Sequence, residues 1–139
     1  MAVGGPNERS DYHINPTEEW FYQLKGDMLL KVVRNADGED LIFEDVWIKE
    51  GGMFMLPADV PHNPIRFVDT LGIVVERTRI RGEHLDRIRW YCKKCKDTVH
   101  EESFFLEDVQ VQLREVIEKY ASSEALRTCK SCNFINPAQ

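Results

Sequence analysis

Short apolar runs, each closed by a turn signal, follow one another from residue 19 to residue 90. Within residues 27–34 the apolar side chains recur with the two-residue period of a strand. The pair Asp37-Gly38 that follows is a hairpin turn signal. Strands this short, separated this regularly, are typical of an antiparallel barrel or sandwich, so the pattern predicts a mainly β fold.

Two runs in this region predict different local structures. Residues 71–79 are the most strand-like because they are rich in β-branched side chains. Residues 59–67 contain Pro61 and Pro64, which cannot donate a backbone hydrogen bond and which restrict the residue before them. This second run is therefore predicted to be mostly loop.

The period changes near the C-terminus, where residues 107–123 predict a single helix. Acidic residues lead this segment and Lys119 lies late in it, as the helix dipole favours. The chain is therefore predicted to form a β-barrel over residues 1–90 and a small tail over residues 91–139. The apolar side chains at helical spacing are Val109, Leu113, Val116, Ile117 and Tyr120.

Four cysteines stand as two C-x2-C pairs on either side of that helix. Cys92 and Cys95 form the first pair, and Cys129 and Cys132 form the second. Paired motifs of this kind in a reducing compartment are typical of metal sites rather than of disulfides. Four thiolates complete a tetrahedral shell around Zn(II) or a rubredoxin-type iron and leave no open position. We therefore predict a structural four-cysteine metal site in the tail.

Charge and hydropathy argue against two classes of partner. The net charge of the 139 residues is −6, and Lys and Arg do not cluster as they do in nucleic-acid-binding proteins. No run approaches the roughly 20 apolar residues that cross a bilayer, and no signal peptide is visible. We expect a cytoplasmic protein that acts on a small molecule or binds a protein partner.

Two histidines and one glutamate suggest a second metal site. His13 precedes Glu19 by six positions, and His62 lies in a proline-rich stretch beside a strand end. Two imidazoles and one carboxylate can cap one face of a non-haem Fe(II) ion and leave its other positions open. The spacing alone is weak evidence, and an ordinary polar loop running into a strand remains an alternative.

Three further charged residues are candidates for binding or catalysis. Arg66 follows His62 by four residues and Arg9 precedes His13 by four, and either guanidinium suits a substrate carboxylate. Both arginines are equally compatible with a solvated surface position. Glu76 lies in an apolar run, where a carboxylate is costly unless it is paired.

The stretches "GGPNERSDYH", "EEWFYQLKG", "LPADVPHNPIRF", "GIVVERTR" and "IRWYC", with the final C-x2-C, resemble the 3-hydroxyanthranilate 3,4-dioxygenase family of the cupin superfamily. The resemblance implies a double-stranded β-helix (jelly-roll) barrel with an Fe(II) site held by His13, Glu19 and His62. Adjacent strand residues point to opposite faces, so only one of Glu18 and Glu19 can reach the metal, and the family motif selects Glu19.

The resemblance also implies a reaction. The substrates would be 3-hydroxyanthranilate and O2, and ring cleavage would give 2-amino-3-carboxymuconate semialdehyde, which cyclises to quinolinate in NAD biosynthesis from tryptophan (the kynurenine pathway). Arg66 would bind the substrate carboxylate, Arg9 would lie near the O2 position, and Glu76 would act on the substrate hydroxyl. The rival hypotheses are a non-catalytic metal-binding cupin module and a cupin dioxygenase of a different aromatic acid.

Compared with that family the chain starts late. The resemblance implies an N-terminal segment that adds strands, contributes to a dimer contact and closes part of the pocket. We therefore expect an N-terminally short version of the enzyme whose activity has to be tested directly, and a homodimer is one expectation for its assembly.

Overall fold

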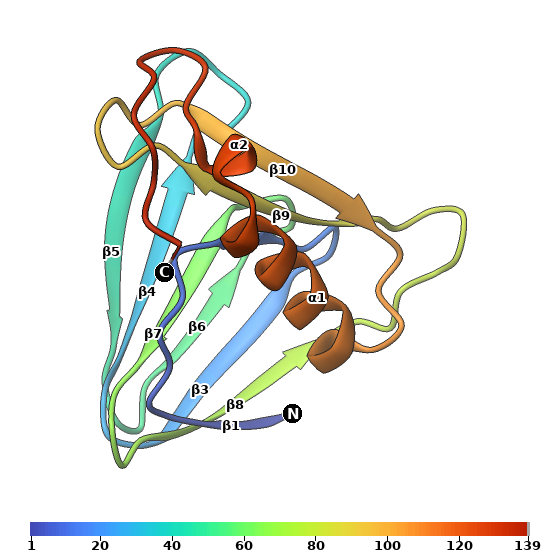
Figure 1. The fold of residues 1–139 in the computed structure, drawn as a ribbon. Helices are drawn as coiled ribbons and strands as arrows, with labels where there is room; N and C mark the ends of the chain where they lie inside the picture. Colours follow the sequence, from blue (N-terminus) through green and yellow to red (C-terminus); the bar gives the residue numbers. More distant parts are fainter. Residues whose placement is uncertain (139) are drawn as a thin grey trace. The chain divides into compact units, whose positions relative to one another are not determined.

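The computed structural model describes residues 1–138 and divides into two compact units. The first unit consists of Met1–Arg9 and Ile14–Thr78, and the second consists of Ser10–His13 and the chain from Arg79 onward. Figure 1 labels both helices and most of the strands of these units. The predicted division into a barrel over residues 1–90 and a tail over residues 91–139 stays a prediction, and the segment just before residue 91 belongs to the second unit.

The first unit is built from two groups of antiparallel strands. One forms a four-stranded sheet in the order β1-β8-β3-β6, and the other runs in the order β7-β4-β5. The strands are β1 (Ala2–Gly4), β3 (Glu19–Lys25), β4 (Met28–Arg34), β5 (Ile42–Ile48), β6 (Met53–Leu56), β7 (His62–Arg66) and β8 (Leu71–Glu76).

The core of the first unit lies between these two groups. Met28, Leu30 and Val32 share one face of β4, as their alternation predicts, and each is at most 1% exposed. Burying each such side chain contributes roughly 1.5–3 kcal/mol. This arrangement confirms the predicted mainly β class and is consistent with a cupin fold. The apolar side chains that meet them are Phe21, Leu56 and Val74 from the four-stranded sheet and Ile48 from β5.

The prediction of mostly loop over residues 59–67 is wrong, because His62–Arg66 form strand β7. Pro64 lies opposite Leu30 of β4, and its carbonyl oxygen accepts a hydrogen bond from the side-chain amide of Asn7 at 2.7 Å. The nitrogen and carbonyl of one strand residue point to the same side, so the missing N–H of Pro64 faces away from β4. The ladder between β4 and β7 therefore loses no hydrogen bond to the proline.

The second unit contains a strand hairpin and two helices. Strands follow one another in the order β10-β9-β2, and the boundary between the units crosses β2 between His13 and Ile14. Strand β10 and the short helix α2 are not predicted by the sequence pattern. Neither helix within residues 1–138 is long and apolar enough to cross a membrane. The elements are β2 (Tyr12–Ile14), β9 (Asp86–Tyr91), β10 (Thr98–Phe104), α1 (Val109–Ser122) and α2 (Glu124–Arg127).

Helix α1 confirms the prediction of a helix over residues 107–123 and packs against the β9–β10 hairpin. Its N-cap is Asp108, whose side chain accepts from the backbone N–H groups of Gln110 and Val111. Tyr120 stacks on Trp90 of β9, with ring centroids 4.0 Å apart and an interplanar angle of 10°. This packing explains why β9, which the sequence pattern assigns to the barrel, belongs to the second unit.

Candidate metal centres

Glu19 and His62 meet inside the first unit. Glu19 begins β3 and His62 begins β7, and both side chains point into the interior, where the residues are 3% and 2% exposed. Nε2 of His62 lies 2.6 Å from Oε2 of Glu19. The two predicted ligands, 43 positions apart in the sequence, are thus brought into contact by the facing of the strands.

The chemistry of this contact is that of a shared cation. Nδ1 of His62 is 3.0 Å from the carbonyl oxygen of Val60, an acceptor, so the Nδ1 proton is donated to that oxygen. In the neutral ring Nε2 then carries a lone pair, and the 2.6 Å contact with Glu19 lacks hydrogen-bond geometry. Two electron-rich atoms at this separation repel unless a cation lies between them, so the pair fits a metal ion.

A proton can take the place of that metal ion. Burial lowers the pKa of His62, but the charge of Glu19 and its contact with the ring raise it more, so the pKa of His62 lies above its ordinary value. The positive charge of Arg9 acts in the opposite direction. The pair therefore favours one positive charge at this point, whether it is carried by a proton or by a metal.

Glu18, the residue just before β3, and Glu19, its first residue, have opposite environments, as the strand period predicts. Glu18 forms an ion pair at the surface, where its carboxylate accepts from Nε of Arg77 at 2.9 Å. Glu19 is buried against His62. The structure therefore puts the residue selected by the family motif in the interior.

Arg66 lies four residues after His62 on β7, an even spacing that turns both side chains to the same face of the strand. It is 3% exposed, and burial lowers the pKa of its guanidinium. Its side-chain partner is Gln23, whose Oε1 is 3.5 Å from Nη1 of Arg66. Among residues 1–138, Arg66 has no carboxylate partner. A buried arginine without an acid is costly by itself, and a bound carboxylate would remove that cost.

A glycine makes room for the Arg66 side chain. A Cβ on Gly72 would lie 2.8 Å from Nη1 of Arg66 and 2.4 Å from Oε1 of Gln23. Both distances are shorter than real carbon contacts allow, so the guanidinium can occupy this position only because residue 72 has no side chain.

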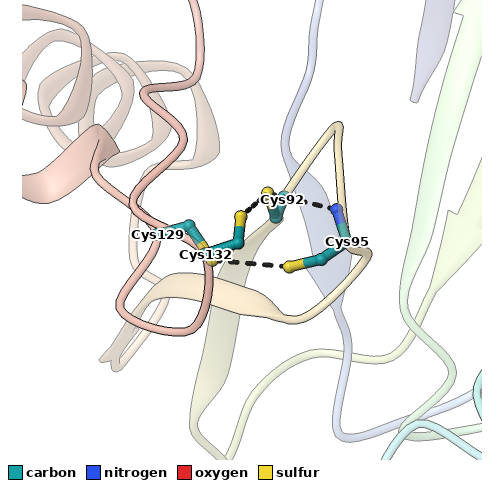
Figure 2. A group of neighbouring side chains, drawn as sticks. All are labelled: Cys92, Cys95, Cys129 and Cys132. Carbon is teal, nitrogen blue, oxygen red and sulfur yellow. Dashed lines mark hydrogen bonds between the residues drawn. The ribbon is translucent and has the colours of Figure 1, made fainter.

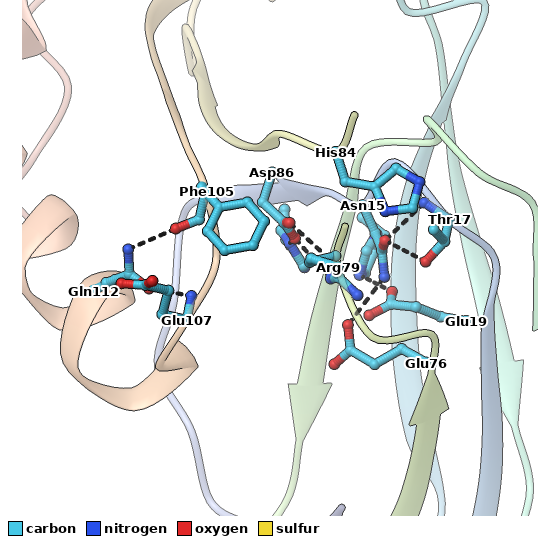
Figure 3. A network of polar contacts seen from close by, with 12 residues as sticks. Asn15, Thr17, Glu19, Glu76, Arg79, His84, Asp86, Phe105, Glu107 and Gln112 are labelled. Carbon is cyan, nitrogen blue, oxygen red and sulfur yellow. Dashed lines mark hydrogen bonds and ion pairs between the residues drawn. The ribbon is translucent and has the colours of Figure 1, made fainter. Parts of the chain in front are cut away.

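Glu76 is the direct cross-strand neighbour of Glu19, so both carboxylates lie on the same face of the sheet. One oxygen of Glu76 accepts from Nδ2 of Asn15 at 3.1 Å (Figure 3). The orientation of the Asn15 amide is fixed, because its oxygen accepts from both the backbone N–H and the hydroxyl of Thr17 at 2.8 Å. Glu76 is half-buried, in agreement with its place in an apolar run.

Arg9 is half-buried in the first unit, and its backbone oxygen accepts from Nδ2 of Asn63 at 2.9 Å. Asn63 directly follows His62, and the charge of Arg9 acts on the pKa of that histidine. The structure therefore brings Arg9 into the electrostatic environment of His62.

His13 belongs to the second unit, where its Nε2 lies 2.7 Å from Oδ2 of Asp86. Asp86 begins β9 and is fully buried. Arg79 donates to both oxygens of Asp86 at 2.7 Å, as Figure 3 shows. Burial alone would raise the pKa of the Asp86 carboxyl, but the hydrogen bonds from Arg79 and His13 outweigh it and lower that pKa.

The four cysteines of the second unit form one cluster (Figure 2). Two Sγ···Sγ distances, from Cys92 to Cys132 and from Cys95 to Cys129, are 3.6 Å. Ligands about 2.3 Å from a tetrahedral Zn(II) stand roughly 3.8 Å apart, whereas the sulfurs of a disulfide are about 2.05 Å apart. The spacing therefore fits a metal ion and not a disulfide, in agreement with the sequence prediction.

The two C-x2-C turns are built in the same way. In the first, the N–H of Cys92 donates to the carbonyl of Asp97 at 2.7 Å, and Lys96 donates back to Cys92 at 3.0 Å. In the second, Cys129 donates to Phe134 at 2.8 Å and Asn133 donates back to Cys129 at 2.9 Å. Lys96 and Asn133, each directly after a pair, both have positive φ.

The sulfur of Cys92 accepts two backbone hydrogen bonds, from Lys94 at 3.4 Å and Cys95 at 3.5 Å. Burial raises the pKa of the Cys92 thiol. The N–H donors have the larger effect in the opposite direction, so the pKa falls to about 7. The local backbone thus prepares one thiolate before a metal arrives.

Sequence reasoning missed four residues around these centres. Gln23 had a signal, since it is a polar residue at a core-facing position of β3 in register with Glu19 and Phe21. Asn15 and Asp86 had none, because Asn15 donates to Glu76 and Asp86 contacts His13, partners 61 and 73 positions away. Arg79 had none either, because its role depends on that buried Asp86.

Comparison with known proteins places the chain in a family. A sequence model of the family described as 3-hydroxyanthranilic acid dioxygenase matches residues 1–121. The chain belongs to this family. The resemblance seen in its motifs is thereby confirmed.

Relatives in the 3-hydroxyanthranilic acid dioxygenase family are similar over nearly the whole chain. A 3-hydroxyanthranilate 3,4-dioxygenase of Neurospora crassa is 53% identical over 97% of this chain and 72% of its own length. Proteins of the same name from Candida albicans and Podospora anserina are each 52% identical, over 100% and 97% of this chain and 78% and 71% of their own lengths.

Two groups of side chains in this family member could each hold a metal ion, and their donor sets differ. One is the four-cysteine cluster of the second unit, and the other is the Glu19–His62 pair of the first unit, to which the sequence adds His13 as a predicted ligand. The first offers four soft thiolates, and the second offers imidazole nitrogen and carboxylate oxygen.

Proposed function

We propose that this protein is an Fe(II)-dependent ring-cleaving dioxygenase that converts 3-hydroxyanthranilate and O2 to 2-amino-3-carboxymuconate semialdehyde. The product would cyclise to quinolinate, which places the reaction in NAD biosynthesis from tryptophan. The observation that carries the proposal is the 2.6 Å contact between His62 and Glu19, whose geometry calls for a shared cation in the interior of a dioxygenase-family fold.

The proposed iron ligands are His13, Glu19 and His62. Imidazole and carboxylate donors suit Fe(II), and three protein ligands leave positions for substrate and O2. When bound, the ion supplies a template for both reactants and a route for electrons between them.

Arg66 is proposed to bind the substrate carboxylate. Its guanidinium is buried and lacks a carboxylate partner among residues 1–138, so an organic acid would supply the missing charge. The planar fork of arginine matches a carboxylate with two parallel hydrogen bonds. Arg9 is proposed as a second cation at the site, close to where O2 reacts, because its charge acts on His62.

Glu76 is proposed to accept the proton of the substrate hydroxyl. It lies on the same face as Glu19, and the hydrogen bond from Asn15 holds one of its oxygens in place. A positioned carboxylate of this kind is a general base once it is within hydrogen-bond reach of the hydroxyl. Loss of that proton makes the aromatic ring electron-rich, which ring cleavage by O2 requires.

The four-cysteine cluster is proposed to hold Zn(II) or iron in a structural role. Four thiolates fill a tetrahedral shell, so no position remains for a substrate. We also propose a cytoplasmic location, supported by four cysteines that stay as free thiols, and a homodimer as the assembly to be measured.

The test is anaerobic reconstitution with Fe(II), followed by 3-hydroxyanthranilate and O2, with the semialdehyde absorbance as the readout. Glu19→Gln should reduce turnover to background, because the buried carboxylate is lost from the metal. Glu18→Gln is the matched control, since the same change one residue away falls on the surface next to Arg77. Equal turnover in the two variants would reject the site.

A further inference from the structure

Both histidines of the proposed iron site have one ring nitrogen engaged by an oxygen acceptor. In His62 the engaged atom is Nδ1, which donates to the backbone oxygen of Val60. In His13 it is Nε2, which lies 2.7 Å from Oδ2 of Asp86. The two rings are therefore set in opposite tautomers, and different parts of the chain set them.

The partner of His13 is an ionised carboxylate. Asp86 is fully buried, and Arg79 donates to it through Nε and Nη2, both at 2.7 Å. A carboxylate in this state only accepts hydrogen bonds, so the proton of the contact must be on Nε2 of His13. The lone pair of the neutral ring is then on Nδ1.

We propose that Asp86, clamped by Arg79, is a positioning residue that fixes His13 as the Nε2–H tautomer and so presents Nδ1 to the metal. A carboxylate behind a metal-bound imidazole fixes the ring orientation and makes the ligand more basic. The inference rests on the proposed function, because it takes His13 as an iron ligand.

The clamp is well placed for this role. Asp86 is the first residue of β9, the neighbour of the strand that carries His13, and its backbone is fixed by pairing with Phe104 of β10. The two parallel bonds from Arg79 leave the carboxylate little freedom to rotate. His13 is thus held by Asp86, whose backbone is fixed by strand pairing and whose carboxylate is fixed by Arg79.

The experiment removes the clamp without leaving a buried charge. Asp86→Leu with Arg79→Met deletes both charges together, since either change alone would strand its partner in the interior. The control pair is Arg89→Met with Glu101→Leu, which removes another arginine–carboxylate pair of the β9–β10 hairpin. Asp86→Asn, made together with Arg79→Met so that no charge is stranded, is the conservative variant, because its amide oxygen still accepts from Nε2–H.

The first readout needs neither metal nor turnover. In the full-length chain with ¹⁵N-labelled histidine, a long-range proton–nitrogen spectrum distinguishes the two tautomers of His13. We expect Nε2–H in the unmodified protein, in the control pair and in Asp86→Asn, and loss of that tautomer in the Asp86/Arg79 pair. The inference is overturned when the Asp86/Arg79 pair keeps Nε2–H.

The second readout is Co(II) binding after the four-cysteine cluster has been filled with Zn(II). The Asp86/Arg79 double variant should bind Co(II) roughly 10- to 100-fold more weakly than the unmodified chain. Asp86→Asn should lose less affinity for Co(II). The control double variant should keep the affinity of the unmodified chain. Equal weakening in the control pair would overturn the inference. Absence of turnover in the unmodified enzyme, with these shifts intact, would reject the proposed reaction and leave the positioning role standing.

Discussion

The four-cysteine cluster and the His62–Glu19 contact are both candidate metal centres, but they are built on different principles. Each half of the cluster is a local turn in which two ligands lie three residues apart and the backbone bonds repeat from one half to the other. The contact, by contrast, joins the first residues of two strands that face each other across a packed core. Local turns encode a structural site, whereas facing strands create an interior in which charged groups can be held for chemistry.

The largest effect that sharpens this contrast is expected from Cys129→Ser. A structural metal site contributes folding free energy directly, with apparent values of about 10–16 kcal/mol for Zn(II) in small domains. Loss of one thiolate should release the metal and melt the packing of Trp90 on Tyr120 in the second unit. Metal content and near-ultraviolet circular dichroism measure this.

Metal content and near-ultraviolet circular dichroism should also be measured on Glu19→Gln, which changes the interior site instead of the four-cysteine cluster. This variant should keep the metal of its four-cysteine cluster and its near-ultraviolet signal while losing turnover. If Cys129→Ser were as folded as Glu19→Gln, the division into a structural and a chemical site would be wrong.

A smaller effect, confined to the interior site, is expected from Arg66→Lys. The ammonium cannot make two parallel bonds to a carboxylate, and one hydrogen bond to a charged group is worth about 1.5–3 kcal/mol. The ratio kcat/KM should fall roughly 10- to 150-fold, mostly through KM. Arg77→Lys, which changes a surface ion pair with Glu18, is the control and should leave kcat/KM unchanged. An unchanged KM in Arg66→Lys would remove this residue from the carboxylate site.

Gly72→Ala tests the space around the same guanidinium. The new Cβ would lie 2.8 Å from Nη1 of Arg66 and 2.4 Å from Oε1 of Gln23, so both side chains must shift. Overpacking of this kind costs typically about 1–3 kcal/mol of stability, and KM should rise as well. Thermal unfolding and steady-state kinetics check the two effects. Gly4→Ala is the control because its Cβ would meet only an ordinary 3.6 Å contact, and it should change neither quantity.

The smallest effect is expected in the second unit, at Glu102 of β10. Burial raises the pKa of this carboxyl, but the hydrogen bonds from Lys119 of α1 and from His100 lower it more, so its pKa in the folded protein is below the unfolded value. Its stabilisation is therefore present above the unfolded pKa and is lost as the pH falls through the folded pKa.

Glu102→Gln should therefore destabilise the protein at neutral pH by less than about 1 kcal/mol, because the Lys119 ammonium that faces Glu102 is largely exposed to solvent. The difference from the unmodified protein should vanish in acid, as chemical denaturation at several pH values will measure. A difference that grows as the pH falls would have the wrong sign for this ion pair.

Prediction from the sequence succeeded where neighbours along the chain decide the structure. Strands at 27–34 and 71–79, the helix near 107–123 and the paired cysteine turns all follow from local period and spacing. It failed at β7, because the cost of Pro64 depends on which side of the strand its nitrogen faces. Prediction from the sequence also missed β10. This strand pairs with β9, which the sequence pattern had assigned to the barrel.

The candidate site divides in the same way. Family motifs selected Glu19 and His62, but their distance and the tautomer of His62 come from the strands and from Val60. The burial of Arg66 without an acid also had no sequence signature, since an isolated arginine is usually exposed.

By itself, the sequence determined the mainly β class, the paired C-x2-C motif and the chemical types of the interior ligands, because period, spacing and side-chain chemistry are properties of the chain. Only the tertiary structure decided that Glu19 meets His62, that Arg66 is buried beside Gln23, and that Asp86 is clamped by Arg79. The physical reason is that each of these contacts joins residues on different strands or loops, whose separation in space is set by packing and not by position in the sequence.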